Sequence, residues 1–205
     1  MFILDRSGSM SGLEDDTIDG YNSLLAKQRK EPGECRVTTV LFDHQIDVLN
    51  RDVDIKRLRP MTRRQYTVRG CTALLDAVGL TIKRVNRAQK ARPDGRPDRT
   101  IFVVTTDGME NASKIYGLTE VRKMIEKRKR KNGWEFIFLG ANIDAVETAG
   151  DMGIDACRAA TYVADECGTA VMFDGASAAL SSIRCGEAPT GAWKEEIERD
   201  KASRG

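Results

Sequence analysis

The sequence predicts an α/β fold, in which a doubly wound, Rossmann-like and mostly parallel six-stranded sheet carries helices on both faces. Three observations lead to this prediction. Short β-branched and aromatic runs alternate with longer segments of helical periodicity. Two such runs, residues 1–4 and 100–105, are nearly all apolar or β-branched, as in strands buried on both faces. The run 46–49 follows its neighbour after a turn at Asp43-His44, which predicts one short antiparallel edge strand.

The first half of the chain is expected to supply two helices and the strand between them. Apolar residues recur at helical spacing over residues 13–30 and 73–90, and Pro and Gly follow each segment. Residues 36–42 are rich in β-branched residues and predict a strand. Residues 51–71 are polar and irregular, so we expect a long connection that leads up to Thr72.

The second half continues the alternation. The expected elements are a helix over residues 118–131, a strand over 135–139, a short helix over 144–152 and a short strand over 159–163. From residue 165 the pattern is helical and then indistinct. We therefore expect one domain over residues 1–185, followed by a charged, partly disordered tail over residues 186–205.

Length and composition fit a single soluble domain. The chain has 205 residues, 40% of them hydrophobic, which is enough to build a core. Its 33 basic and 31 acidic residues nearly balance, which argues against a dedicated nucleic-acid binder. No apolar run approaches the roughly 20 residues that cross a bilayer, and the N-terminus becomes acidic too early for a signal peptide. We therefore expect a cytoplasmic protein without membrane contact. Its five scattered cysteines, with no Cys-x-x-Cys pair, are expected to be reduced thiols.

Two acidic turns mark the candidate site. Asp5 and Asp107 each follow a predicted buried strand, and ligands of open α/β sheets bind beyond the carboxyl ends of the strands. In the first turn Asp5, Ser7 and Ser9 alternate, so an extended loop can direct three oxygen-bearing side chains toward one point. Carboxylate and hydroxyl oxygens are hard ligands that suit Mg²⁺ or Mn²⁺. A site with so few carboxylates would leave a coordination position open for an outside group.

Three segments resemble motifs of the von Willebrand factor type A domain family. Asp5-Arg6-Ser7-Gly8-Ser9-Met10 resembles its Asp-x-Ser-x-Ser motif, and Thr105-Thr106-Asp107-Gly108 resembles its Thr-Asp-Gly motif. Thr72 resembles the family's isolated metal-site threonine. The three segments occur in the family's order, and the α/β pattern agrees over about residues 1–163.

This resemblance implies a metal-ion-dependent adhesion site. The hydroxyls of Ser7, Ser9 and Thr72 would lie on or near Mg²⁺ or Mn²⁺, and Asp5 and Asp107 would orient waters and hydroxyls behind them. An Asp or Glu carboxylate of a protein partner would complete the metal's coordination. Candidate residues for the rim that contacts this partner flank the proposed ligands: Arg6, Met10, Glu110 and Asn111.

One feature departs from the family pattern. Only four residues precede Asp5, whereas the family's first strand has several residues before the motif. Either the chain starts further upstream, or the first strand is short and contributes fewer ladder hydrogen bonds and less apolar burial.

An enzyme is the main alternative to a binding module. Asp5 would then be the nucleophile of a Mg²⁺-dependent aspartate phosphatase or hydrolase on a related α/β fold. Such enzymes usually place a general acid two residues after the nucleophile, and here that residue is Ser7, a poor proton donor. The single histidine, His44, lies in a predicted turn, and no Gly-x-Ser-x-Gly motif is present around the serines of the first loop, which argues against a Ser-His-Asp hydrolase. A third possibility is a scaffold whose metal site is unused. We predict a non-enzymatic module.

A run of five cations, Lys127 to Lys131, invites a nucleic-acid interpretation. The run lies at the end of a predicted helix, where cations interact favourably with the helix dipole. Asn132-Gly133 then terminates the helix. We interpret the run as a solvated helix end.

Overall fold

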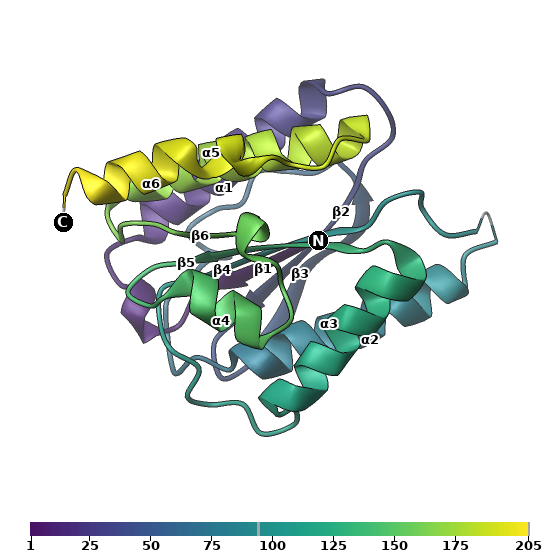
Figure 1. Ribbon diagram of the computed structural model, residues 1–205, viewed down its shortest axis with the longest axis horizontal. Helices are drawn as coiled ribbons and strands as arrows, with labels where there is room; N and C mark the ends of the chain where they lie inside the picture. Colours follow the sequence, from purple (N-terminus) through teal and green to yellow (C-terminus); the bar gives the residue numbers. More distant parts are fainter. Residues whose placement is uncertain (94, 205) are drawn as a thin grey trace.

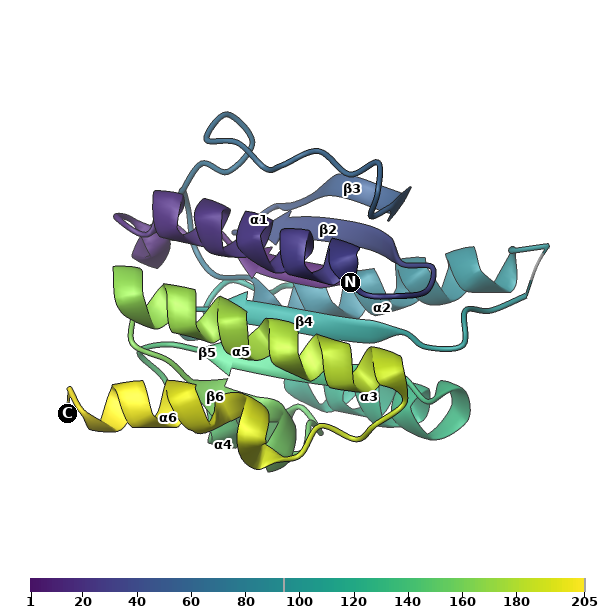
Figure 2. The same ribbon diagram turned by 90° about the horizontal axis from the view of Figure 1, so that it is seen from above.

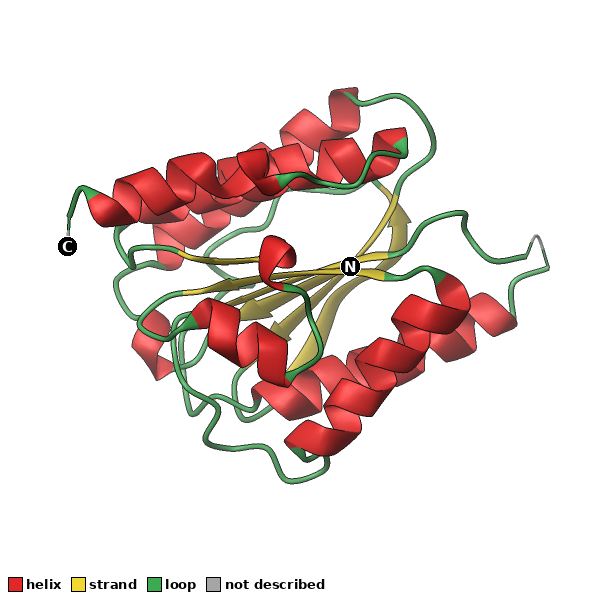
Figure 3. Ribbon diagram, viewed as in Figure 1, coloured by secondary structure: helices red, strands yellow, loops and turns green. Residues whose placement is uncertain are grey.

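The fold is described by a computed structural model, which covers residues 1–93 and 95–204. A six-stranded sheet lies between two layers of helices (Figure 1), as the colouring by secondary structure in Figure 3 also shows. The strands are β1 (Phe2–Asp5), β2 (Arg36–Phe42), β3 (Ile46–Asp54), β4 (Ile101–Thr106), β5 (Glu135–Gly140) and β6 (Ala159–Thr161). Their order in the sheet is β3-β2-β1-β4-β5-β6, and β3 alone runs antiparallel to its neighbour. The predicted fold class is confirmed.

The order of the strands defines a switch point between β1 and β4. From β1 the chain builds outward through β2 and β3, and from β4 it builds in the opposite direction through β5 and β6. Because β1 and β4 are parallel neighbours, the turns that follow them lie side by side. This arrangement brings the two predicted acidic turns to one edge of the sheet.

Within the residues that the structure describes, six helices cover the two faces of the sheet (Figure 2). On one face lie α1 (Glu14–Lys30), α5 (Glu166–Cys185) and α6 (Glu195–Ala202); on the other lie α2 (Leu74–Lys90), α3 (Leu118–Asn132) and α4 (Ala145–Asp151). Successive strand residues supply the two cores alternately. Phe102 and Val104 of β4 pack with α2 and α3, and Val103 packs on the side of α1 and α5. Strands buried on both faces therefore read as continuous apolar runs, as the sequence predicts.

The first strand is short but is paired along both edges. All four residues of β1 are buried, and they pair with Thr39 to Phe42 on one side and Val103 to Thr105 on the other. Met1 extends the pairing, because its amino group donates to the carbonyl of Ile101 at 2.7 Å and its carbonyl accepts from the Val103 amide at 2.8 Å. Pairing on both sides therefore offsets the small number of residues.

Most predicted elements end within a residue or two of the observed ones, but β3 and the C-terminal segment differ. Strand β3 continues to Asp54 instead of ending at residue 49. Its second half is polar and shows no apolar pattern in the sequence, but an edge strand can form without a buried apolar face. Residues 191–202, expected in a partly disordered tail, form a 3-10 turn (Gly191–Lys194) and α6. Trp193 and Ile197 are buried against α5 and anchor this charged segment.

A helix that spans a bilayer needs about 20 consecutive, mostly apolar residues. In residues 1–93 and 95–204, no helix combines the length and the hydropathy needed to span a membrane.

Candidate metal centre

The first loop starts where β1 ends and turns sharply back on itself. The Ser7 amide donates to Asp5 Oδ1 at 2.7 Å, and a 3-10 turn over Gly8–Met10 follows. The side chain of Met10 is buried and anchors this turn to the core. Gly8 lies against the neighbouring loop: its amide donates to the Gly70 carbonyl at 2.9 Å, and a Cβ on Gly8 would lie 3.2 Å from that oxygen. A side chain at position 8 would therefore push the two loops slightly apart.

A continuous chain of hydroxyl groups links the three segments singled out in the sequence. Thr72 Oγ1 lies 3.0 Å from Ser7 Oγ, and Ser7 Oγ lies 3.1 Å from Ser9 Oγ. Ser9 Oγ in turn donates to Asp107 Oδ1 at 2.5 Å. The fold thus gathers Ser7, Ser9 and Thr72 at one point, with Asp5 and Asp107 beside them, at the carboxyl ends of β1 and β4.

The two carboxylates are buried beside these hydroxyls. Burial and, to a smaller extent, the charge of Asp107 raise the pKa of Asp5 to about 6, against the lowering effect of hydrogen bonds from Thr106 and Ser7. Burial likewise raises the pKa of Asp107, against the hydrogen bond from Ser9. Asp107 Oδ2 is buried and has no hydrogen-bond partner among the residues that the structure describes. Two buried carboxylates, one with a vacant oxygen, form an environment that a positive charge would stabilise.

The donor set fits a small, hard divalent cation. Ligands of Mg²⁺ lie about 2.0–2.1 Å from the metal in octahedral geometry, so that neighbouring ligand oxygens are about 2.9 Å apart. The Thr72–Ser7 and Ser7–Ser9 oxygen pairs, at 3.0 and 3.1 Å, have this spacing. Within residues 1–93 and 95–204, no group of three His, Cys, Asp or Glu side chains is arranged to hold a metal. The candidate ligands are thus mainly hydroxyls, which suits Mg²⁺ or Mn²⁺ better than Zn²⁺.

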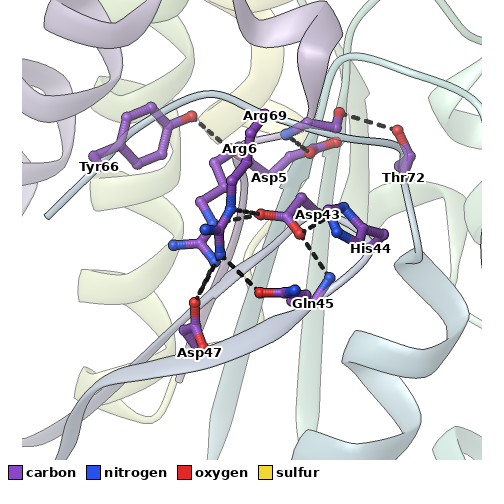
Figure 4. A network of polar contacts seen from close by, with 10 residues as sticks. Asp5, Arg6, Asp43, His44, Gln45, Asp47, Tyr66, Arg69 and Thr72 are labelled. Atoms are coloured by element: carbon purple, nitrogen blue, oxygen red, sulfur yellow. Dashed lines mark hydrogen bonds and ion pairs between the residues drawn. The ribbon is translucent and has the colours of Figure 1, made fainter.

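Thr72 lies on the long connection between β3 and α2, and a buried ion-pair network holds that connection in place (Figure 4). At its centre is Asp43, at the end of β2. Its Oδ2 accepts from Arg6 Nε and from Arg69 Nε, each at 2.9 Å. Arg6 and Asp43 are both buried, and Asp47 contacts both arginines from β3. Asp43 therefore joins the loop after β1 to the segment that precedes Thr72.

Backbone hydrogen bonds reinforce this junction. The Arg69 amide donates to the Arg6 carbonyl at 2.9 Å, and the Ala73 amide donates to the Asp43 carbonyl at 3.0 Å. Burial raises the pKa of Asp43, but hydrogen bonds from Arg69 and Gln45 and the charge of Arg6 outweigh it and hold the pKa below its usual value. Asp43 is therefore a carboxylate at neutral pH, and it neutralises two cations that lie close to the candidate metal ligands.

The four residues expected at the rim differ in how far they are exposed. Arg6 and Met10, expected at the rim, are buried and have no surface to offer a partner. Glu110 is engaged inside its own loop, where its carboxylate accepts from the amides of Leu75, Ala112 and Ser113. Asn111 is exposed, although its side-chain oxygen accepts from the Thr72 amide at 2.9 Å. Short side chains in loops serve local hydrogen bonding more often than the sequence reveals.

Several residues that support the candidate ligands are not evident from the sequence. Thr106 Oγ1 donates to Asp5 Oδ2 at 2.6 Å, and the Tyr66 hydroxyl donates to the Asp5 carbonyl. Asn142, which follows β5, donates to the Asp107 carbonyl at 3.3 Å. Thr106 lies inside a quoted motif and could have been found there. Tyr66 and Asn142 come from segments with no motif, so only the fold reveals them.

The same geometry bears on the enzyme alternative. Asp5 is buried, its Oδ1 accepts from the Ser7 amide, and its Oδ2 accepts from the Thr106 hydroxyl. A nucleophilic carboxylate needs an oxygen free to approach its substrate, so this arrangement disfavours Asp5 as a nucleophile. His44 is about half exposed, next to Asp43 in the turn predicted for it, and its Nδ1 lies 3.1 Å from Asp43 Oδ1. It is not in contact with a serine hydroxyl that it could activate.

Comparisons with known proteins show which fold this chain shares with solved structures. No protein-family model matches the chain, and neither does any curated protein. Solved structures match well. The von Willebrand factor type A structure from Catenulispora acidiphila is 15% identical with a TM-score of 0.56, and the alignment covers 86% of this chain and 41% of that one. For the manganese-loaded TRAP protein of Plasmodium vivax the values are 17% identity, a TM-score of 0.56, and coverage of 83% and 70%.

A third match is the ArnB paralog VWA2 from Sulfolobus acidocaldarius, at 14% identity and a TM-score of 0.54, covering 85% of this chain and 43% of that one. This protein therefore has the von Willebrand factor type A fold. It spans less than half the length of the Catenulispora and Sulfolobus chains. At these identities the likeness establishes the fold, and the function is argued from the site.

Proposed function

We propose that this protein is a divalent-metal-dependent binding module that grips an acidic side chain of a protein partner, and that it is not an enzyme. In this proposal Ser7, Ser9 and Thr72 hold Mg²⁺ or Mn²⁺ through their hydroxyls, with Asp5 and Asp107 behind them. The observation that carries the proposal is the spacing of 3.0 and 3.1 Å between these hydroxyl oxygens, which matches the edge of a Mg²⁺ octahedron.

Two further observations support a metal at this position. Asp107 Oδ2 is buried without a hydrogen-bond partner among the described residues, and a nearby cation would satisfy it. Burial raises the pKa of both Asp5 and Asp107, and the charge of Asp107 adds to the rise at Asp5; a nearby divalent charge would offset these effects. One of the structures with this fold, TRAP of Plasmodium vivax, is described as manganese-loaded.

The surroundings suggest how a partner is held. A bound metal supplies a positive charge with an open coordination position, to which a carboxylate oxygen of the partner binds. Met109 and Asn111 follow Asp107 on the same loop, and both are exposed, Met109 by 74%. We assign these two residues to the rim, so that the preferred partner presents an Asp or Glu next to an apolar side chain.

Titration calorimetry with Mn²⁺ tests the metal site. Wild type is expected to bind one Mn²⁺ with a Kd in the micromolar to millimolar range, and Thr72→Val, which removes the hydroxyl at nearly constant volume, to bind at least tenfold more weakly. Thr72→Ser keeps the hydroxyl and serves as the matched control. Equal affinity of wild type, Thr72→Val and Asp5→Ala would reject the site.

The function has a test of its own. A partner retained on immobilised wild type in Mg²⁺ should be released by chelation and should fail to bind Thr72→Val. A panel of phosphomonoesters assayed with Mg²⁺ distinguishes the binding module from the enzyme alternative. We expect no turnover by wild type; turnover that is lost in Asp5→Asn would contradict the proposal.

A further inference from the structure

The positive charge of this protein is concentrated on two adjacent helices. Helices α2 and α3 together contain eleven basic and three acidic residues, a net charge of +8. The whole chain carries +2, so everything outside these two helices carries a net −6. One of the three acids is Asp76, whose carboxylate accepts hydrogen bonds from the amides of Lys114, Ile115 and Tyr116. The near-balanced composition therefore conceals a strongly polarised molecule.

The cations form one surface because the two helices pack side by side. Both cover the same face of the sheet (Figure 1), and Arg128 of α3 donates to the side-chain oxygen of Asn86 in α2 at 2.7 Å. The basic residues of this α2/α3 face are Lys83, Arg84, Arg87, Lys90, Arg122, Lys123, Lys127, Arg128, Lys129, Arg130 and Lys131. Helices α1 and α6, which each have three acidic residues in the first turn, lie across the sheet on its other face.

Few of these charges are neutralised within the molecule. Among residues 1–93 and 95–204, carboxylates pair with only two of the eleven: Arg122 with Glu126, and Lys129 with Asp155. Cations are also crowded together here, because burial first and then the charge of Arg96 lower the pKa of Arg128. The helix dipole accounts for cations in the last turn of α3. It does not account for Lys83 and Arg84 in the middle of α2, or for Arg122 and Lys123 near the start of α3.

We propose that the α2/α3 face binds double-stranded nucleic acid through its phosphates, without reading the base sequence and independently of the metal centre. A basic face along helices is the electrostatic footprint of nucleic-acid binding. The face offers no exposed aromatic ring for stacking on unpaired bases, since Tyr116 and Trp134 are buried. A duplex, whose bases are already stacked, fits such a surface better than a single strand.

A lipid membrane is the less favoured partner for this face. The large apolar side chains that are exposed in the described part of the chain are Met109, Ile115, Leu118 and Val146. Ile115 and Leu118 lie at one end of the face, around the start of α3, and none of the four lies between residues 83 and 90 or between residues 122 and 131. Most of the cationic surface therefore carries no group suited to insert among lipid tails.

The experiment measures binding of a fluorescent 25-base-pair DNA duplex of arbitrary sequence by anisotropy, over a series of salt concentrations. If about four phosphates are contacted, the affinity of wild type should fall about 100-fold between 50 and 200 mM salt. The fourfold variant Arg87→Gln, Lys123→Gln, Lys127→Gln and Lys131→Gln should bind at least tenfold more weakly at 50 mM and show a shallower salt dependence. All four residues are exposed.

A matched control removes the same number of charges elsewhere. Lys56→Gln, Arg59→Gln, Arg64→Gln and Lys114→Gln are also exposed positions and give the same net charge. This variant should bind the duplex like wild type, and wild type should bind it equally in Mn²⁺ and in a chelator. The proposal is overturned if both fourfold variants lose affinity equally, if wild type shows no binding at 50 mM salt, or if it binds vesicles containing phosphatidylserine more tightly than the duplex.

Discussion

Replacing Gly108 by alanine is expected to weaken metal binding while leaving the fold intact. A Cβ at this position would lie 3.0 Å from Ser9 Oγ and 3.5 Å from Thr72 Oγ1. Gly108 is not among the residues with positive φ, so alanine adopts its backbone conformation without strain. The added methyl group instead displaces the Ser9 hydroxyl by a few tenths of an ångström. Mg²⁺ and Mn²⁺ sites depend on ligand position, and changes beside the ligands typically cost about 10- to 100-fold in affinity.

The assay is Mn²⁺ calorimetry together with urea unfolding in the presence of a chelator. We expect Mn²⁺ affinity to fall about tenfold, or about 1.4 kcal/mol, because one of three hydroxyls is displaced. The unfolding free energy without metal should change by less than about 1 kcal/mol. Gly150→Ala is the control, because a Cβ there would have no neighbour within 4 Å. Unchanged Mn²⁺ affinity in Gly108→Ala would refute the reasoning that Ser9 and Thr72 lie at the metal.

Three further predictions concern the residues that support the site and the C-terminal segment. Asp43→Asn should lower the unfolding free energy by about 3 kcal/mol at pH 7, because the buried Arg6 then keeps only the exposed Asp47 as a charge partner. Since the pKa of Asp43 is held below its usual value, this difference should shrink as the pH falls below about 4 in acid-dependent urea unfolding, and a constant difference would contradict the ion-pair account. Tyr66→Phe should cost about 1–3 kcal/mol in urea unfolding by leaving the Asp5 carbonyl without its donor, whereas unchanged stability would count against that bond. Trp193→Ala should cost about 3–5 kcal/mol and expose residues 191–202 to protease, and wild-type resistance would show that α6 is not anchored there.

The sequence predicts the sheet well because buried strands and amphipathic helices have distinct apolar patterns. The runs at residues 36–42 and 135–139 are rich in β-branched or aromatic residues, and the observed strands agree within one residue. Where burial is partial the pattern fails. The second half of β3 is polar, because it lies at the sheet edge, and α6 buries only Ile197. A single buried residue produces no periodicity, so the helix is hidden in a charged segment.

The candidate ligands can be found in the sequence because they belong to the three segments that resemble family motifs, whereas most of the groups that position them do not. Asp5 and Asp107 follow buried strands, and the parallel pairing of β1 with β4 brings them together. Asp43 and Tyr66 are ordinary residues in sequence, and their roles depend on long-range contacts with the first loop. For the same reason the exposure of the expected rim residues is predicted less well, since no local sequence pattern reveals that the Arg6 side chain is buried against Asp43.

Anomalous scattering from crystals soaked in Mn²⁺ tests the central claim most directly. The account predicts one strong peak among the hydroxyls of Ser7, Ser9 and Thr72, about 2.1 Å from at least two of them, and no such peak in Thr72→Val. An absence of the peak at millimolar Mn²⁺, or a peak away from these residues, would contradict the account.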